Sequence, residues 1–106
     1  MQPSVDFLEA DVLAKMQFLV NSRTRIRVLA TLTAGRWTES ELTDELDEPQ
    51  ATIHQNIGKL VARDLAETEE GSYVATWRGK VLADVVADYG SRVATVDDLA
   101  EFLAHV

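Results

Sequence analysis

The sequence contains no cysteine, only two prolines and only five glycines in 106 residues. Without cysteine, the chain cannot build a disulfide framework, an iron–sulfur cluster, a thiolate zinc site or a cysteine nucleophile. No apolar run approaches the roughly 20 residues of a membrane-spanning helix, and no charged-then-apolar leader opens the chain. We therefore expect a soluble cytoplasmic protein that does not bind membranes. The length predicts a single core that buries about two thirds of the unfolded surface.

Positive charge is also scarce, and it is unevenly distributed. The chain has 18 Asp and Glu against 10 Lys and Arg, giving a formal net charge of −8. A uniformly acidic surface would repel the phosphates of nucleic acid. Residues 12–38 and 49–63 contain no carboxylate, however, whereas residues 39–48 contain six, 64–70 four and 84–101 five. This segregation is the first indication of function, because it predicts a surface with an acid-free side.

Apolar spacing and capping residues predict a series of helices that is interrupted by short strands. The string TESE forms a capping box, with Thr38 as N-cap and Glu41 three residues later. Gly90 is expected to end a helix. Further predicted N-caps are Asn21-Ser22, Thr76 and Thr95. The predicted helices span 6–20, 23–34, 39–46, 49–63, 77–89 and 96–106, with an extended piece at 36–38 and a hairpin of 65–69 with 72–76.

This order of helix, short strand, helix, tight turn, helix and two-stranded wing resembles the winged helix-turn-helix regulators of the MarR, ArsR and TrmB kind. The resemblance covers residues 22–79, in the strings SRTRIRVLATLTAG, TESELTDELDEPQATIHQNIGKLVARD and LAETEEGSYVATWRGKVLA. Three patterns match the family, namely Ala51-Thr52-Ile53 and Ile57-x-x-Leu60 in the recognition helix, and Thr76-x-x-Gly79 after the wing. The resemblance implies a mainly α fold with a small β-wing, and a regulator without catalysis or cofactor.

The resemblance also implies how the chain is organised. We expect an N-terminal dimerisation helix in 1–21, a winged helix-turn-helix domain in 22–79 and C-terminal dimerisation helices in 80–106. Apolar stripes on the terminal helices predict a homodimer. The expected interface residues are Phe7, Leu8, Val12, Met16, Leu99, Phe102 and Leu103. Abundant acid with few lysines is similar to the composition of halophilic archaeal proteins, whose short regulators often continue into a second, sensing domain.

The acid-free stretch 49–63 is the candidate DNA-reading helix. Amide side chains can bond adenine bidentately, and small side chains can touch a thymine methyl, so its outward residues suit a major groove. The candidate base-reading residues are Gln50, Thr52, His54, Gln55 and Asn56. The candidate phosphate contacts are Lys59 and Arg63, with Arg23, Arg25 and Arg27 from the first core helix. Gly58 allows a close approach, either of DNA or of a neighbouring helix.

The wing departs from the family pattern. Family wings commonly have a basic tip, whereas the candidate tip Glu69-Glu70-Gly71-Ser72 is acidic and follows Glu67. Either high salt screens its repulsion from DNA, or the domain is a protein–protein interaction module that does not bind DNA. Trp37, Trp77 and Tyr73 are expected to be packing residues.

An enzyme is the third and least supported class of function. No nucleophile–base pair, glycine-rich phosphate loop or metal-ligand spacing is present. Two histidines, His54 and His105, disfavour a histidine metal site, whereas the many carboxylates leave an Asp/Glu site open.

Overall fold

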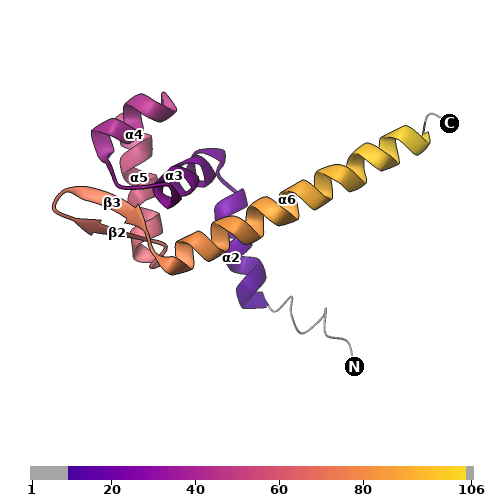
Figure 1. Ribbon diagram of the computed structural model, residues 1–106, viewed down its shortest axis with the longest axis horizontal. Helices are drawn as coiled ribbons and strands as arrows, with labels where there is room; N and C mark the ends of the chain where they lie inside the picture. The colour runs from indigo at the N-terminus through magenta and orange to yellow at the C-terminus, as the bar shows by residue number, and fades with distance from the viewer. Residues whose placement is uncertain (1–9, 105–106) are drawn as a thin grey trace.

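The computed structural model describes the backbone of residues 10–104 and the side chains of residues 14–91. Its helices and strands follow the expected order and form a mainly α fold with a small β-wing (Figure 1). They are α2 (Ala10–Val20), α3 (Arg23–Thr33), β1 (Trp37–Thr38), α4 (Glu39–Leu46), α5 (Gln50–Ala62), β2 (Ala66–Glu69), β3 (Ser72–Ala75) and α6 (Trp77–Ala104). The winged-helix prediction is therefore confirmed. The predicted start of the first helix, at residue 6, lies outside the described residues.

The core is centred on α3, which contacts α2, α4, α5, α6 and β3. Val28, Leu29 and Leu32 of α3 are almost inaccessible to solvent. Their spacing at i, i+1 and i+4 places them on the inner side of the helix, where apolar burial is the main stabilising contribution. The surrounding helices add Phe18, Leu19, Leu42, Leu46, Ile53, Ile57 and Leu60.

A three-stranded antiparallel sheet in the order β1-β3-β2 closes one end of the domain. Its hairpin turns at Glu70 and Gly71, whose φ angles of 52° and 83° are both left-handed. Two left-handed residues are typical of the hairpin turn whose twist matches the flanking strands. Trp37 is opposite Tyr73 in the register, and both half-buried side chains pack against the core, which confirms their packing roles.

Side-chain caps define the starts of α3 and α4, as predicted. Both bonds of the capping box are present, since Glu41 N donates to Thr38 Oγ1 at 3.1 Å and Thr38 N donates to Glu41 Oε1 at 2.8 Å. The Ser22 hydroxyl accepts from Arg25 N at 3.1 Å and caps α3. These bonds satisfy N–H groups that have no partner within the helix.

The C-terminal part of the chain differs from the prediction. Gly90 and Thr95 were expected to end one helix and begin another, but α6 runs through both as one helix of 28 residues (Figure 1). A glycine inside a helix costs only about 1 kcal/mol relative to alanine and keeps its N–H donor, so it does not break a helix as proline does. The packing role expected for Trp77 is also wrong, because its side chain is 67% exposed at the first residue of α6.

The start of α6 is held against the end of α5 by Thr76 and Gly79. The Thr76 hydroxyl donates to the Asp64 carbonyl at 2.7 Å and accepts from Gly79 N at 3.0 Å. Thr76 N also donates to the Leu65 carbonyl at 3.0 Å. A Cβ added at Gly79 would overlap the backbone of Leu65, so only glycine fits where α6 passes this segment.

We therefore expect Gly79→Ala to lower the free energy of unfolding by about 1–3 kcal/mol, as overpacked sites do. Gly90→Ala is the control, because a Cβ there would meet no atom within 4 Å. That variant should be unchanged or more stable, by up to about 1 kcal/mol. Urea unfolding followed by circular dichroism measures both, and equal stability of the two variants would contradict the close contact.

Candidate nucleic-acid interface

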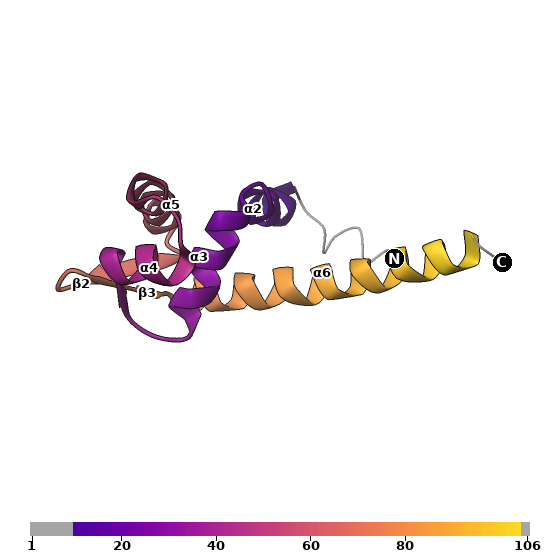
Figure 2. The ribbon, with the colours of Figure 1, turned by 90° about the horizontal axis from the view of Figure 1, so that it is seen from above.

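Helix α5 is positioned by its buried apolar side. Pro49 precedes it with φ −58°, which suits a helix start. Ile53, Ile57 and Leu60 are buried in the core, and their spacing fixes which residues of α5 face outward. Figure 2 shows α5 at the edge of the domain, on the same side of the molecule as α2. The opposite side of α5 is therefore available to solvent.

The exposed side of α5 carries most of the predicted reading residues. Gln50, His54, Gln55 and Lys59 are exposed, and Thr52 is half-buried. No residue of α5 is Asp or Glu. This face therefore combines amide, imidazole and ammonium groups without a carboxylate of its own helix.

His54 is engaged with the neighbouring helix. Its Nδ1 atom lies 3.0 Å from Glu39 Oε2 at the start of α4, and the His54 side chain is 73% exposed. The pair connects α4 and α5 at the surface, which makes Glu39 the carboxylate next to the reading face. His54 must leave Glu39 before its Nδ1 can bond another acceptor or donor.

Gly58 lies on the same exposed side. A Cβ added at Gly58 would meet no atom within 4 Å, so no described helix approaches it closely. Packing against another helix in the described part of this chain therefore does not explain Gly58.

The expectation that Asn56 faces outward is wrong. Its side chain is only 6% exposed, because residue 56 follows Ile53 by three positions and precedes Leu60 by four on the inner side of α5. The Asn56 Oδ1 atom accepts from Arg25 Nε at 3.2 Å, and Nδ2 donates to the Thr52 carbonyl at 3.0 Å. Asn56 is thus a buried structural residue and is not available to a base.

Arg25 is likewise buried, at 9% exposure, so the phosphate role predicted for it is also wrong. Its Nη1 donates to the Phe18 carbonyl, and its Cζ lies 4.3 Å from the centroid of the Phe18 ring. Burial, and secondarily the positive charge of Arg63, lower the pKa of the Arg25 guanidinium. We call Phe18, Arg25 and Asn56 the arginine cluster. It joins α2, α3 and α5.

The other predicted phosphate contacts differ in accessibility. Arg23 and Lys59 are exposed. Arg27 pairs with Glu48 Oε1 at 3.4 Å and donates to the Leu46 carbonyl at 3.1 Å, which ties α3 to the end of α4. Arg63 lies over the Phe18 ring, with its Cζ 3.9 Å from the centroid. Arg25, Arg27 and Arg63 are thus engaged in contacts within the domain, whereas Arg23 and Lys59 are the more accessible candidates for a phosphate contact.

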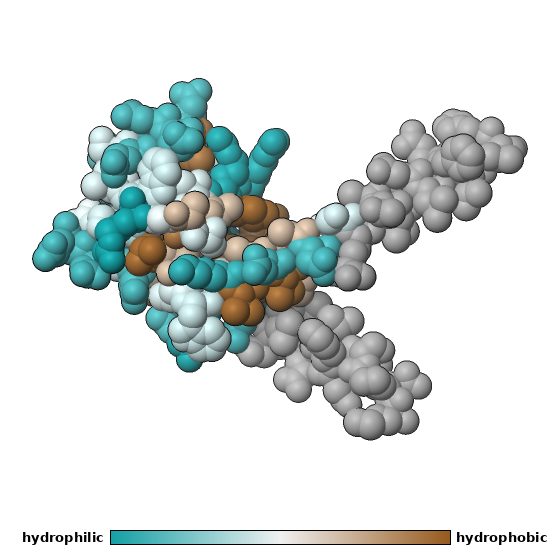
Figure 3. All heavy atoms as spheres, in the orientation of Figure 1, coloured by the Kyte–Doolittle hydropathy of each residue, from teal (hydrophilic) through white to brown (hydrophobic). Residues whose placement is uncertain are grey.

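The wing presents carboxylates at the surface. Glu69 pairs with Arg36 at 3.2 Å between Oε2 and Nη2, although both side chains remain well exposed. Ser72 Oγ donates to the Glu69 carbonyl at 3.0 Å beside the turn of Glu70 and Gly71. Figure 3 shows hydrophilic side chains over the wing and α4. The acidic tip thus remains accessible to any partner of the domain.

The predicted dimer residues lie mostly outside the described side chains, namely Phe7, Leu8, Val12, Leu99, Phe102 and Leu103. Met16 is described and half-buried. A second apolar feature was not predicted from the sequence: α6 exposes Trp77, Val81, Val85 and Tyr89. Their regular i+4 spacing places them along one side of α6 and was readable in the sequence. Figure 3 shows hydrophobic side chains along the first half of this helix.

Within the described residues, no group of three or more His, Cys, Asp or Glu side chains is placed to hold a metal ion. No helix in that part of the chain has the length and hydropathy to cross a bilayer.

The arginine cluster yields a stability prediction. Asn56→Ala leaves the buried Arg25 Nε without its acceptor, so unfolding should become easier by about 1–3 kcal/mol. Gln55→Ala is the matched control on the exposed side and should change stability by less than about 0.5 kcal/mol. Thermal or urea unfolding distinguishes a buried structural role of Asn56 from an exposed one. An Asn56→Ala variant as stable as the wild type would contradict the structural role.

Three solved structures are similar to this chain over most of its length. The activation domain of the phage T4 transcription factor MotA has a TM-score of 0.62 and 17% identity, over 83% of this chain and 98% of that one. The adhesin competence repressor AdcR of Streptococcus pyogenes has a TM-score of 0.59 and 21% identity, over 93% and 79%. Reduced HlyU of Vibrio cholerae has a TM-score of 0.56 and 17% identity, over 84% and 97%. At these identities, the similarity supports the winged-helix fold.

No curated protein sequence matches this chain significantly. The family model described as the HVO_A0261 N-terminal domain matches residues 13–98, which is most of the chain. The matched residues include every helix and strand from α3 to β3. The chain therefore belongs to the HVO_A0261 N-terminal domain family.

Proposed function

We propose that this chain is a transcription regulator that binds double-stranded DNA and reads base sequence with the exposed side of α5 in the major groove. One observation carries the proposal, namely that α5 exposes Gln50, Gln55 and Lys59 but no carboxylate, in a chain of net charge −8. In the whole chain, Asp and Glu outnumber Lys and Arg by 18 to 10. A helix face that excludes them fits a polyanionic partner better than it fits solvent alone.

The roles of the side chains follow from their positions along α5. Gln50 and Gln55 lie in its first half, where a recognition helix approaches base edges, and each amide can bond adenine N6 and N7. Lys59 lies one turn further, where a phosphate contact is expected. Arg23 at the start of α3 is a second phosphate contact. Gly58 lets the DNA backbone approach α5 without a side chain between them.

The acidic wing makes the proposed DNA binding depend on salt concentration. Carboxylates at Glu67, Glu69 and Glu70 repel phosphates in dilute buffer, whereas at about 1 M salt the Debye length falls to about 3 Å. Under that screening, base-edge hydrogen bonds gain weight relative to long-range charge. We therefore propose a halophilic archaeal regulator of the MarR, ArsR and TrmB type, working in the cytoplasm without catalysis.

The DNA-binding proposal predicts different effects for two neighbouring residues. Gln55→Ala should reduce discrimination between base pairs by about 1–3 kcal/mol, because a bidentate contact is lost. Lys59→Ala should weaken binding to all sequences alike and reduce the salt slope by about one. Selection from a random duplex library in molar KCl, followed by affinity measurements at several salt concentrations, separates these effects.

The control for this experiment is Lys80→Ala, which removes the same charge from α6 and leaves α5 unchanged. It should bind DNA as the wild type does. If the wild type enriches no sequence in molar KCl, the regulator proposal is refuted.

We also propose a homodimer that uses α2 and α6 and leaves both copies of α5 free. Exposed Tyr89, at the end of the apolar stripe on α6, supports an interface on that helix. Two reading helices would bind two half-sites, which raises the affinity that one small module can reach. Light scattering with size-exclusion chromatography in high salt should give twice the chain mass, and a monomer across the micromolar range would contradict the proposal.

A second candidate function is a protein-interaction module that does not bind DNA. Two observations favour it, namely the exposed acidic wing tip and the similarity to an activation domain. Charge reversal at the wing distinguishes the two, because Glu69→Lys with Glu70→Lys should strengthen DNA binding in dilute buffer if the wing lies near phosphates. No effect on DNA binding, with loss of a protein partner, would favour the interaction module.

A further inference from the structure

The hydrogen bond between His54 and Glu39 holds one ring nitrogen on the exposed side of α5. His54 Nδ1 lies 3.0 Å from Glu39 Oε2, and the Glu39 side chain is 21% exposed against 73% for His54. The Nδ1 atom is therefore held by α4, while most of the ring is open to solvent. A partner that approaches α5 from outside can reach the other ring nitrogen, Nε2.

The start of α4 determines where the Glu39 carboxylate lies. Glu39 is the first residue of this helix, directly after the N-cap Thr38, and the capping box of Thr38 and Glu41 holds this turn. The Glu39 carbonyl also accepts from the Thr43 hydroxyl at 2.9 Å. The positive end of the helix dipole favours the ionised form of a carboxylate at this position. Glu39 is therefore a positioned, ionised acceptor.

The chemistry of the two groups decides where the proton of His54 lies. An ionised carboxylate accepts hydrogen bonds but cannot donate one. A neutral imidazole carries one proton, on either Nδ1 or Nε2, and its other nitrogen is an acceptor. In the bond with Glu39, the proton of a neutral His54 must therefore be on Nδ1. The Nε2 atom is then an acceptor on the exposed side of α5.

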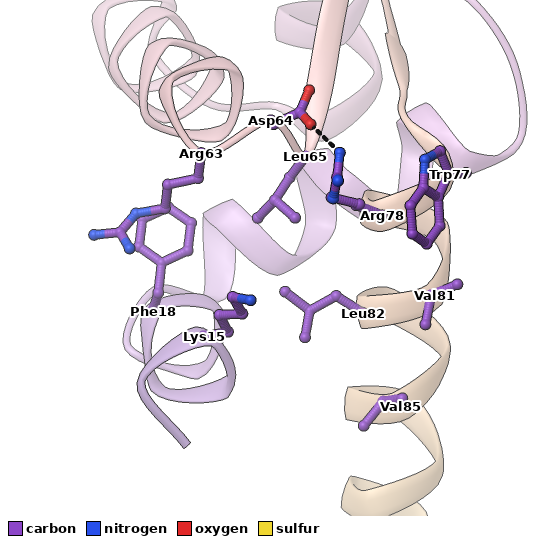
Figure 4. A pocket seen from close by; sticks show the side chains of 10 residues that line it. All are labelled: Lys15, Phe18, Arg63, Asp64, Leu65, Trp77, Arg78, Val81, Leu82 and Val85. Carbon is purple, nitrogen blue, oxygen red and sulfur yellow. Dashed lines mark hydrogen bonds and ion pairs between the residues drawn. The ribbon is translucent and has the colours of Figure 1, made fainter. Parts of the chain in front are cut away.

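The surroundings of the ring add no competing charge. On the side of the wing, His54 borders a hollow of about 200 Å³ whose other lining residues are uncharged, among them Tyr73. Arg63, at the end of α5, lies instead against Phe18, beside the pocket between α2 and α6 (Figure 4). Among the described residues, Glu39 is thus the charged group in contact with the imidazole.

We propose that Glu39 is a positioning residue for base recognition, because it keeps the proton of His54 on Nδ1 and so makes Nε2 an acceptor. In the major groove, cytosine N4 and adenine N6 are amino donors, whereas guanine O6 and thymine O4 are keto acceptors. His54 therefore selects an amino base over a keto base on the strand that it contacts. The tautomer is independent of DNA, whereas the base preference rests on the proposed function.

Nitrogen-15 spectra of the imidazole rings test the tautomer in the free protein. They are recorded at about pH 8.5, where an ordinary imidazole is neutral. We expect the signal of a protonated nitrogen for His54 Nδ1 and that of an unprotonated nitrogen for His54 Nε2. The variant His54→Ala assigns these signals, because the chain contains two histidines.

Glu39→Gln tests whether the carboxylate fixes the tautomer. The amide has the size of the carboxylate but can accept through its oxygen or donate through its nitrogen, so it supports both tautomers of His54. The two ring-nitrogen signals should therefore move toward each other. Glu45→Gln is the matched control, because it removes the same charge from an exposed position of α4 and should leave both signals unchanged.

Two results in the free protein would overturn the role of Glu39. One is a wild-type His54 that carries its proton on Nε2. The other is an identical pair of ring-nitrogen signals in the wild type and in folded Glu39→Gln.

Base preference forms the second arm of the test, with single-base variants of a duplex selected by the wild type at the same pH. The position read by His54 is the one at which His54→Ala loses its preference. There the wild type should favour an amino base by about tenfold, since Nε2 facing a keto oxygen leaves two acceptors unpaired. Glu39→Gln should reduce this preference to about threefold or less, whereas Glu45→Gln should retain it.

The outcomes of this arm separate the base preference from the proposed function. An unchanged base preference in His54→Ala, or a wild-type preference for a keto base, would refute the reading role of His54 and leave DNA binding by α5 standing. A wild type that selects no duplex would refute the proposed function together with the reading role. The spectra of the free protein decide in that case too whether Glu39 fixes the tautomer.

Discussion

The buried guanidinium of Arg25 is the constraint on which the placement of α5 depends. It is 9% exposed, donates to the Phe18 carbonyl of α2 and to Asn56 Oδ1 of α5, and lies over the Phe18 ring. Leaving a charged group buried without partners costs far more than apolar mispacking, so these partners must stay in register. Apolar contacts of Ile53, Ile57 and Leu60 hold α5 against the core, while the arginine cluster fixes its rotation. That rotation decides which residues of α5 reach solvent.

The exposed side of α5 follows from this rotation. With Asn56 turned inward, the side that remains carries Gln50, His54, Gln55 and Lys59 and no carboxylate. The carboxylates of the domain lie instead on α4, on the wing tip and along α6. The acid-free and acid-rich stretches of the sequence thus form different surfaces of the domain. The C-terminal cap of the same helix, Arg63, lies over the Phe18 ring of α2.

Much of the fold was predictable because its local signals are strong and agree with one another. Thr38 and Glu41 form the capping box that their spacing predicts, and Ser22 and Thr76 cap the helices that follow them. The turn at Glu70 and Gly71 also lies where the hairpin was expected. Gly90 misled the prediction, because the cost of one helical glycine is smaller than the gain from continuing α6. The residue type at position 90 does not reveal the free energy that a longer helix gains, so this outcome could not be predicted from the glycine alone.

The candidate site was predicted less completely, for a different reason. Polar character suggested that Asn56 and Arg25 face outward, but each is the other's buried partner across 31 positions of sequence. A pair of this kind satisfies its hydrogen bonds internally, so polarity no longer reports exposure. The apolar stripe from Trp77 to Tyr89 was missed because Trp77 was expected to be a packing residue, whereas its side chain is 67% exposed. Whether a polar pair is buried, or an apolar side of a helix is exposed, depends on tertiary contacts. Sequence periodicity alone does not report these contacts.

Titration of isotope-labelled protein with a selected duplex in molar KCl, followed by amide chemical shifts, shows whether the exposed side of α5 contacts DNA. We expect the largest shift changes on residues 50–59 of α5. The side-chain amide signals of Gln50 and Gln55 should shift, whereas that of the buried Asn56 should stay unchanged. Changes confined to the wing tip or to α6, with α5 unaffected at saturation, would contradict this expectation.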